Sequence, residues 1–305
     1  MNNRLSPDPP TMEDLLHRYR DKITSIGSRH ERLHTLRHLL AHTGPASPKY
    51  AVEGVWAHRK LLAVGQAAEE LYFAPDFIYS AEALDLLASC LERVTAAYVL
   101  SAKVFTKLSE RDNPDGFLST GTLLLHDSHS LSLALPEGAV VMVLDGLETP
   151  GNAGTILRSC DGAGVDAVLF CRTRTRLTHP KLIKASMGAV FTLPLAVFDN
   201  PEDCAGWLEE RGFTIFLADA NADTWVYAEG ETEGQGEGDL GNTALVVGNE
   251  RYGLRQSWYG AAVRTVAIPM RGFGDSLNVG VAASILAYSF CHKKRCSRSK
   301  RSNGK

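Results

Sequence analysis

The most constraining feature of the sequence is residues 139–164, AVVMVLDGLETPGNAGTILRSCDGAG, where an apolar run meets a turn rich in glycine and proline. The run AVVMVLD is apolar up to its final aspartate, which is typical of a parallel strand that is buried on both faces. A helix is expected in NAGTILRSCDGAG, and further strands and helices alternate down to residue 292. This alternation predicts an α/β fold in which helices cover a parallel sheet.

At 305 residues the chain has room for a second domain. Residues 12–42 are predicted to be helical, and shorter strands and helices follow down to residue 125. The sequence therefore predicts five parts. These are a flexible lead (1–20), a small α/β domain (21–125), a linker (126–138), the parallel-sheet domain (139–292) and a disordered basic tail (293–305).

Charge is distributed unevenly along the chain, although the formal net charge is only −3. Residues 17–43 hold six Arg or Lys, five His and two acids, and the last thirteen residues hold seven basic residues and no acid. Both segments could contact phosphates, or they could be a solvated helix face and a disordered tail. The acidic, glycine-rich segment 229–239 is predicted to be a flexible surface loop.

The six cysteines show no CxxC motif and no metal-ligand spacing with histidine, so we expect reduced thiols and no metal site. The N-terminus, MNNRLSPDPPTMEDLL, lacks the apolar core of a signal peptide. No run of eighteen apolar residues is present that could span a membrane. We therefore expect a soluble, cytoplasmic protein without a membrane partner.

Three loops at the carboxyl ends of predicted strands combine glycines with polar side chains, namely ETPGNAGTILRS, GNERYGLR and PMRGFGDSLNVG. Ligands of open parallel sheets bind at this edge, and glycine allows close approach of the backbone. A dinucleotide turn is disfavoured because the first loop lacks G-x-G-x-x-G, and the chain has no G-x-x-x-x-G-K-[ST] phosphate loop. Each loop alone could be an ordinary connection, but three at one edge indicate a ligand site.

In order, spacing and composition, these loops resemble the three motifs of the SpoU/TrmH-type RNA ribose 2′-O-methyltransferases of the SPOUT superfamily. PGNAGTILRSCDGAG is similar to the first motif, LVVGNERYGL to the second and IPMRGFGDSLNVGVAASILAY to the third, and HPKLIKASMGAVFTLPL resembles the intervening segment. Upstream, ITSIGSRHERLHTLRHL, YAVEGVWAHRKLL and VFTKLSERDNPDGFLS resemble the family's N-terminal RNA-substrate-binding domain. The resemblance extends over residues 23–288.

The resemblance implies a SPOUT domain with a deep trefoil knot at its C-terminal end, preceded by a substrate-binding domain that is similar to a small ribosomal protein. No sequence pattern predicts a knot, since knots are rare exceptions among folds. In this family the knot forms the pocket for the cofactor S-adenosyl-L-methionine, and a homodimer completes the active site.

The implied reaction transfers a methyl group to a ribose 2′-hydroxyl, which needs positioning and a proton acceptor. Arg158 matches the arginine proposed as the base, but arginine normally stays protonated, so binding the neighbouring RNA phosphate is the alternative. On a helix face packed against the sheet, Arg158 would need an acidic or phosphate partner. Glu250 would pair with Arg158 or with a group of the partner subunit. Asn152 would orient Arg158 or the ribose, and Ser276 and Asn278 would hydrogen-bond to the ribose or the loop.

Cofactor and RNA contacts are implied by the same resemblance. The positions that match those holding the adenine and ribose of the cofactor are Gly248, Asn249, Ile268, Met270 and Leu277. The basic N-terminal segment would contact RNA through Arg29, Arg32 and Arg37. Such contacts give affinity without choosing the base.

The leading interpretation is an S-adenosyl-L-methionine-dependent methyltransferase of ribosomal RNA of the 23S type, because the two-domain layout resembles the ribosomal branch of the family. A transfer RNA ribose methyltransferase is the second interpretation, and a self-protection enzyme against a ribosome-targeting antibiotic is a third. A non-catalytic RNA-binding or ribosome-assembly protein would tolerate loss of Arg158 and Asn278, and both are present. A small-molecule oxidoreductase is the weakest alternative, because G-x-G-x-x-G is missing.

Overall fold

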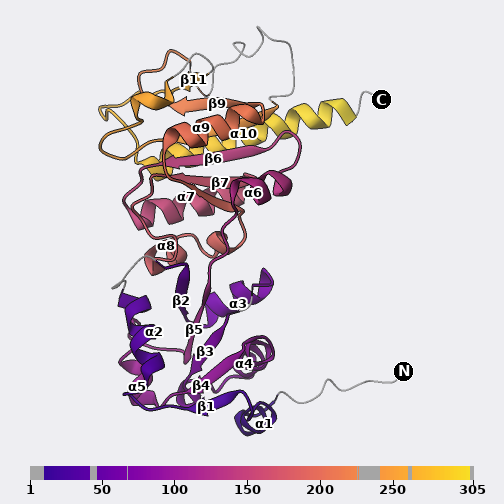
Figure 1. The fold of residues 1–305 in the computed structure, drawn as a ribbon, viewed down its shortest axis with the longest axis vertical. Coiled ribbons are helices and arrows are strands. Elements are labelled where there is room, and N and C mark those ends of the chain that lie inside the picture. The colour runs from indigo at the N-terminus through magenta and orange to yellow at the C-terminus, as the bar shows by residue number, and fades with distance from the viewer. Residues whose placement is uncertain are drawn as a thin grey trace. The chain divides into compact units, whose positions relative to one another are not determined.

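The chain divides into two compact units, Met1–Leu123 and Leu124–Lys305 (Figure 1). The structure is a computed structural model that describes residues 10–41, 47–66, 68–224, 226, 241–259 and 263–302, with side chains up to residue 294. The predicted acidic loop, residues 229–239, lies outside the described residues. Each unit has its own β-sheet.

The first unit contains a five-stranded mixed sheet in the order β1-β4-β3-β5-β2, in which β5 is antiparallel to both neighbours. Its strands are β1 (Ile23–Ser25), β2 (Lys49–Glu53), β3 (Glu70–Phe73), β4 (Ala96–Val99) and β5 (Phe117–Thr122). Its helices are α1 (Met12–Arg18), α2 (Glu31–Ala41), α3 (Val55–Ala63), the short 3-10 helix η1 (Pro75–Phe77), α4 (Ala81–Arg93) and α5 (Ala102–Thr106).

Helices cover both faces of this sheet. On one face, Leu33 of α2 and Phe105 of α5 are fully buried in one core cluster. On the other face, Leu15 of α1 and Leu87 of α4 are fully buried in a second cluster. The unit is therefore a small α/β domain with two hydrophobic layers.

The single helix predicted over residues 12–42 is wrong, because a strand interrupts it. α1 ends at Arg18, β1 pairs in parallel with β4, and α2 begins only at Glu31. The β-branched residues Ile23 and Thr24 favour the extended conformation. The edge of the sheet supplies their hydrogen-bond partners, which no local helical pattern can reveal.

A buried histidine links the stability of the first unit to pH. His58 on α3 is 1% exposed, with Nδ1 2.8 Å from the carbonyl oxygen of Gly54 and Nε2 2.7 Å from Oγ of Ser119. Burial lowers the pKa of His58 below its usual value, although the hydrogen bond to Gly54 and the charge of Asp115 act in the opposite direction. The folded unit therefore holds this imidazole neutral, with Nδ1 donating to the carbonyl oxygen.

We expect the free energy of unfolding of the first unit to fall on acidification. The unfolded state protonates His58 near pH ~6.5, whereas the folded state does so only at lower pH, so stability declines below ~6.5 by at most about 1.4 kcal/mol per pH unit. Urea unfolding between about pH 7.5 and about pH 5.5 measures this slope. In a His58→Gln variant this contribution should vanish, and an unchanged slope would contradict the assignment.

The second unit contains a six-stranded sheet in the order β11-β9-β10-β6-β7-β8, and every neighbouring pair is parallel. This confirms the predicted parallel α/β fold. Its strands are β6 (Val140–Asp145), β7 (Ala167–Cys171), β8 (Leu195–Phe198), β9 (Phe213–Ala218), β10 (Asn242–Val247) and β11 (Val263–Val266). Its helices are α6 (Ser128–Ala134), α7 (Pro150–Ala163), α8 (Pro180–Ala185), η2 (Ala189–Phe191), α9 (Pro201–Glu210), η3 (Gln256–Trp258) and α10 (Val279–Ser302).

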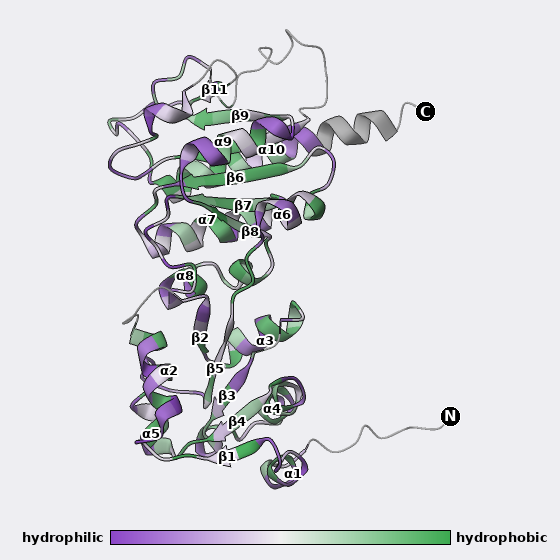
Figure 2. Cartoon of the chain, viewed as in Figure 1, coloured by the Kyte–Doolittle hydropathy of each residue, from purple (hydrophilic) through white to green (hydrophobic). Residues whose placement is uncertain are grey.

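The central strand β6 is buried at every position, and Figure 2 shows most of its length as hydrophobic. On one face, Leu131 of α6 and Trp207 of α9 pack in a cluster with Val141 and Val143. On the other side, α7 packs against both α8 and α10. β6 lies between β10 and β7, where the strand order reverses, and such a point opens a crevice at the carboxyl ends of the strands.

Residues 126–138 are part of the second unit, whereas the sequence predicts a linker there. They contain α6, whose start is capped by Asp127 through a 2.7 Å hydrogen bond from the backbone N–H of Ser130. Leu131 is fully buried, and His126 bridges to Ala196 of the sheet. Asp127 as a cap residue and Leu131 as an apolar residue four positions later favour a helix, but the polar composition of the segment suggested a linker instead.

The basic tail predicted from residue 293 also differs from the structure. α10 continues to Ser302, so the chain is helical through most of the predicted tail. The Nζ atom of Lys294 donates to the carbonyl oxygen of Gly241 at 3.1 Å, and Lys294 is buried. A run of basic residues in sequence therefore includes one that has a structural role.

Candidate active site

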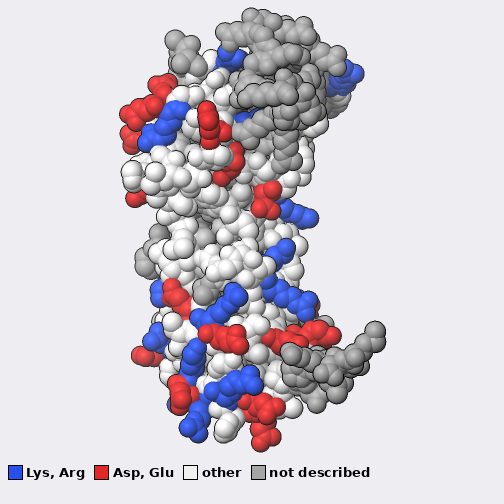
Figure 3. All heavy atoms as spheres, turned by 90° about the vertical axis from the view of Figure 1, so that its right-hand side faces the viewer, with Lys and Arg blue, Asp and Glu red and all other residues white. Residues whose placement is uncertain are grey.

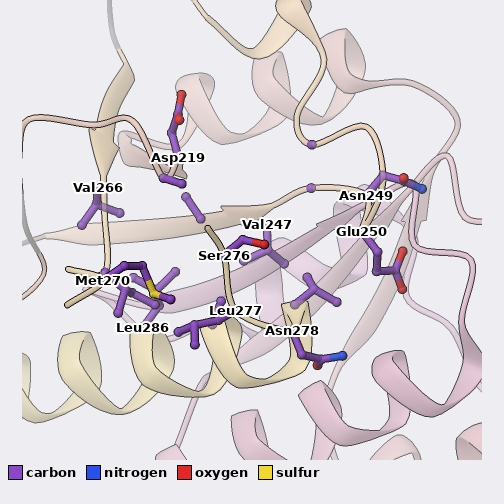
Figure 4. A pocket seen from close by; sticks show the side chains of 17 residues that line it. Asp219, Val247, Asn249, Glu250, Val266, Met270, Ser276, Leu277, Asn278 and Leu286 are labelled. Carbon is purple, nitrogen blue, oxygen red and sulfur yellow. The ribbon is translucent and has the colours of Figure 1, made fainter. Parts of the chain in front are cut away.

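A pocket of about 440 Å³ opens at the carboxyl edge of the parallel sheet. The segments that follow β9, β10 and β11 and the start of α10 surround it (Figure 4). Val247, Ile268 and Leu286 give it an apolar lining, while Asp219 and Glu250 add carboxylates. Its size and mixed lining suit a small organic ligand.

Most of the site residues predicted from the sequence line this pocket. The predicted cofactor residues that line it are Gly248, Asn249, Ile268, Met270 and Leu277. The predicted catalytic residues that line it are Glu250, Ser276 and Asn278. Asn152 adjoins the pocket through hydrogen bonds, and Arg158 is not part of the lining.

The turn after β10 requires glycine at its first position. A Cβ atom on Gly248 would lie 2.4 Å from the carbonyl carbon of Gly253 and 2.6 Å from the backbone nitrogen of Leu254, which is closer than such atoms can approach. Asn249 and Gly253 close the turn by exchanging backbone hydrogen bonds of 3.0 and 2.9 Å. Any side chain at position 248 would therefore push this turn out of place.

The side chain of Asn249 holds the same turn rigid. Its Oδ1 accepts hydrogen bonds from the backbone N–H groups of Arg251 and Tyr252, at 2.9 and 3.0 Å. Its Nδ2 donates to the carbonyl oxygen of Gly146 at 2.7 Å. The turn after β10 is thereby fastened to the loop after β6.

A chain of polar side chains joins the three motif loops. Nδ2 of Asn152 donates to Oε1 of Glu250 at 2.9 Å, and Nδ2 of Asn278 lies 3.4 Å from Oδ1 of Asn152. Oδ1 of Asn278 accepts the backbone N–H of Gly280 at 2.8 Å. Burial alone would raise the pKa of Glu250, but hydrogen bonds, first among them that from Asn152, lower it below its usual value. Glu250 is therefore an ionised acceptor at neutral pH.

Arg158 lies on the exposed side of α7, away from the sheet. Leu157 takes the buried position, so Arg158 does not pack on the sheet as expected. Within this chain Glu250 bonds to Asn152, and the pairing of Glu250 with Arg158 or with a group of a partner subunit stays a prediction. Among the residues with described side chains, no acidic group forms an ion pair with Arg158. Its guanidinium is therefore free to contact a group outside its own chain.

Asp219 is a pocket residue that the sequence motifs do not include. It follows β9 directly, and its Oδ2 accepts a 2.8 Å hydrogen bond from the hydroxyl of Tyr259. Burial and this hydrogen bond raise the pKa of Tyr259 to about 12, so the hydroxyl stays protonated. Asp219 follows the carboxyl end of a strand of the parallel sheet, and this position could have identified it in the sequence as a candidate pocket residue.

A buried ion pair, also missed by the motif comparison, lies where β6 ends. Asp145 is fully buried, and its Oδ1 accepts from Nε and Nη2 of Arg172 at 2.9 and 2.8 Å. Its Oδ2 accepts from Nε1 of the buried Trp258 at 3.0 Å. The hydrogen bond to Asp145 raises the pKa of Arg172 despite partial burial. This carboxylate therefore joins β6, β7 and the segment after β10.

The three arginines predicted to contact RNA are exposed on the first unit. Arg32 forms a 2.9 Å ion pair with Glu70, and Arg37 donates to the carbonyl oxygen of Ser28 at 3.1 Å. On the face of this unit drawn in the lower half of Figure 3, basic and acidic side chains are interspersed. The described part of that face therefore has no separate basic patch that would mark an RNA-binding surface.

In the part of the chain that the structure describes, no group of three or more His, Cys, Asp or Glu side chains is placed so that it could hold a metal ion. Over the same residues, no helix combines the length and the apolar character needed to cross a membrane.

Known proteins match the second unit and, more weakly, the whole chain. The model of the SpoU rRNA Methylase family matches residues 139–288. A 23S rRNA (uridine(2479)-2'-O)-methyltransferase of Streptomyces viridochromogenes is 28% identical over 90% of this chain and 88% of its own length. A putative TrmH family tRNA/rRNA methyltransferase of Staphylococcus epidermidis is 34% identical over 51% of this chain, and the match spans only 59% of that relative.

A solved structure of an rRNA methyltransferase has a similar fold. An AdoMet-bound rRNA methyltransferase from Sinorhizobium meliloti superposes with a TM-score of 0.73, covering 90% of this chain and 98% of that one at 22% identity. The family match contains the parallel sheet and all three glycine-rich loops, of which the second and third line the pocket. Residues 139–288, which contain the sheet and these loops, are therefore similar to the SpoU rRNA Methylase family.

Proposed function

We propose that this protein is an S-adenosyl-L-methionine-dependent RNA methyltransferase that methylates a ribose 2′-hydroxyl of ribosomal RNA of the 23S type. The observation that carries the proposal is the chain of hydrogen bonds from Asn278 through Asn152 to Glu250 beside the pocket. The Streptomyces relative, whose name gives this reaction in 23S rRNA, matches 90% of the chain. That match favours ribosomal RNA over transfer RNA.

The residues of the pocket fit S-adenosyl-L-methionine. Its volume of about 440 Å³ is adequate for a cofactor of this size. Val247, Ile268 and Leu286 offer apolar surface to a planar adenine, and the carboxylates of Asp219 and Glu250 suit a cationic ligand. When bound, the cofactor supplies a methyl group on a sulfonium.

The polar side chains beside the pocket would position the ribose. The amide of Asn152 is fixed on both sides, by Glu250 and by Asn278, so it loses little freedom when a substrate binds. Ser276 is exposed at the pocket, where its hydroxyl can hydrogen-bond to the ribose. Glu250 accepts from the amide nitrogen of Asn152, and Asn278 uses one lone pair of its oxygen, so the second lone pair can accept from a donor such as the 2′-hydroxyl.

A homodimer would account for the position of Arg158. Val281 and Tyr288 of α10 are 48% and 54% exposed, on a helix that packs against α7 through a 2.6 Å hydrogen bond between Ser284 and Ser159. Exposed apolar side chains along one helix are typical of an interface. A second copy on this face would bring its Arg158 to the first copy's pocket, to accept the 2′-hydroxyl proton or to bind the neighbouring phosphate.

The remaining features belong to the same proposal. The segments around the pocket would form a deep trefoil knot. The first unit would be the RNA-substrate-binding domain, with Arg29, Arg32 and Arg37 on phosphates, because these side chains are exposed. An RNA substrate implies that the protein acts in the cytoplasm.

Transfer of labelled methyl groups from S-adenosyl-L-methionine to unmodified bacterial ribosomal RNA and bulk transfer RNA tests the proposed function. Label in ribosomal RNA, with one linkage resistant to alkali, is expected because a methylated 2′-hydroxyl cannot attack the adjacent phosphate. Label in transfer RNA alone would favour the second interpretation, a transfer RNA ribose methyltransferase. Absence of both label and cofactor binding would leave an RNA-binding protein.

We expect Gly248→Ala to weaken S-adenosyl-L-methionine binding by at least about tenfold, since the new methyl group would displace the turn that lines the pocket. Isothermal titration with the cofactor measures this effect. Gly272→Ala is the matched control, because a Cβ at Gly272 meets no atom within 4 Å. Equal affinities of the two variants would contradict the role given to the turn.

A further inference from the structure

Exposed aromatic side chains gather on the segments that surround the pocket. Among the described residues, the exposed aromatic side chains are Tyr79, Tyr252, Tyr259, Phe273 and Tyr288. Tyr252 and Tyr259 follow β10, and Phe273 lies between β11 and α10. The hydroxyl of Tyr259 is bound to Asp219, so Tyr252 and Phe273 are the two whose rings are presented to solvent beside the pocket.

Tyr252 stands on the rigid turn that Asn249 closes. Its backbone N–H is held by Oδ1 of Asn249, and the guanidinium of Arg251 lies 5.3 Å from the centre of its ring. The side chain is 72% exposed. Because only Arg251 separates Tyr252 from Glu250, their Cα atoms lie within about 7 Å of each other. A flat aromatic surface is thus held next to the polar side chains of the site.

Phe273 projects from the loop that closes the other side of the pocket. It is fully exposed and stands between Gly272 and Gly274, where no side chain competes for space. Met270 and Ser276 of the same loop line the pocket. A phenylalanine completely in water adds nothing to a hydrophobic core, and both faces of its ring are open to a ligand.

Arginines outnumber acids on these segments. Arg251, Arg255 and Arg271 are exposed there, and the exposed acids are Glu250 and Asp275. Arginine binds phosphates and stacks on bases. Aromatic rings among arginines are the combination by which proteins bind unpaired nucleotides.

We propose that Tyr252 and Phe273 are stacking sites for unpaired bases of the RNA next to the ribose that receives the methyl group. This inference rests on the proposed function and narrows its substrate to a loop or single strand. In a regular duplex the base faces are covered by their neighbours, so neither ring could stack on them. Arg251 and Arg271 contact the phosphates of the same nucleotides.

Binding of the full-length chain to a single-stranded oligouridylate and to an RNA duplex of equal length tests the proposal. Tyr252→Ala and Phe273→Ala should each weaken oligouridylate binding by about tenfold, the loss of one stacked base, and leave duplex binding unchanged. Tyr252→Phe and Phe273→Tyr should retain binding, because the ring is kept. Leu133→Ala, which removes a largely exposed apolar side chain from α6, is the control.

Three results would overturn the proposal. These are unchanged oligouridylate binding in both alanine variants, a wild type that prefers the duplex, and a Phe273→Ala variant that loses its oligomeric state, which would place the ring on a second copy. Cofactor titration and methyl transfer are measured beside RNA binding. A wild type that binds RNA without transferring methyl groups would contradict the proposed function. The effect of the alanine variants on oligouridylate binding would still test the stacking sites.

Discussion

Replacement of Asp145 by alanine is expected to lower the free energy of unfolding of the second unit by about 3–5 kcal/mol. The carboxylate is fully buried and accepts three hydrogen bonds, two from Arg172 and one from Trp258. Its removal leaves the guanidinium of Arg172 without its counter-charge and the buried indole N–H without an acceptor, and both are costly in a buried environment. Urea unfolding followed by circular dichroism measures the loss.

Glu148→Ala is the matched control for this experiment. Glu148 also pairs with an arginine, Arg174 at 3.0 Å, but both side chains are largely exposed. An exposed pair contributes about 0–1 kcal/mol, because water already solvates both charges. If Asp145→Ala proved no more harmful than Glu148→Ala, the buried carboxylate would not hold these segments together.

Arg158→Ala is expected to reduce the rate of methyl transfer to RNA by a factor of about 10² to 10⁴, the range for loss of a group that transfers a proton or stabilises charge. Thermal unfolding should be almost unchanged, because the side chain is exposed and forms no ion pair within the described part of its own chain. Arg174→Ala, at another exposed arginine of the same unit, should retain activity.

A mixed dimer separates the proposed role of Arg158 in the partner's site from a role in its own. Combining Arg158→Ala with Gly248→Ala subunits should restore roughly a quarter of the wild-type activity, since half of the dimers would be mixed and each would contain one complete site. Recovery would mean that Arg158 acts on the partner's pocket. No recovery would place Arg158 and the pocket in the same subunit.

Much of the second unit can be read from local sequence. The apolar run before Asp145 predicts a strand buried on both faces, and β6 is buried at all six positions. The three glycine-rich loops follow strands of one parallel sheet, so the rule for carboxyl ends places them together without any knowledge of the strand order. The resulting pocket includes Gly248, Ile268 and Leu277. Patterns of this kind depend on neighbours within a few residues, which sequence displays directly.

Contacts between residues that are far apart in the sequence cannot be predicted from local patterns. Asp145 and Trp258 are 113 residues apart, and neither belongs to a motif whose spacing indicates the other. Asp219 enters the pocket only because β9 lies beside β10 in the sheet. In the sequence, α6 has the composition of a polar connection. Its place in the fold becomes apparent only from the structure, in which Leu131 is buried in the core.

The sequence by itself determined the parallel sheet, the three loops and the polar side chains that the loops carry, because strand periodicity and turn composition are local properties. Only the tertiary structure decided the direction of Arg158. α8 approaches α7 so closely that a Cβ on Gly154 would lie 2.5 Å from the carbonyl oxygen of Leu182, and α10 packs beside α7 through Ser284 and Ser159. These two neighbours bury one side of α7, and Arg158 lies on its exposed side, outside the pocket lining.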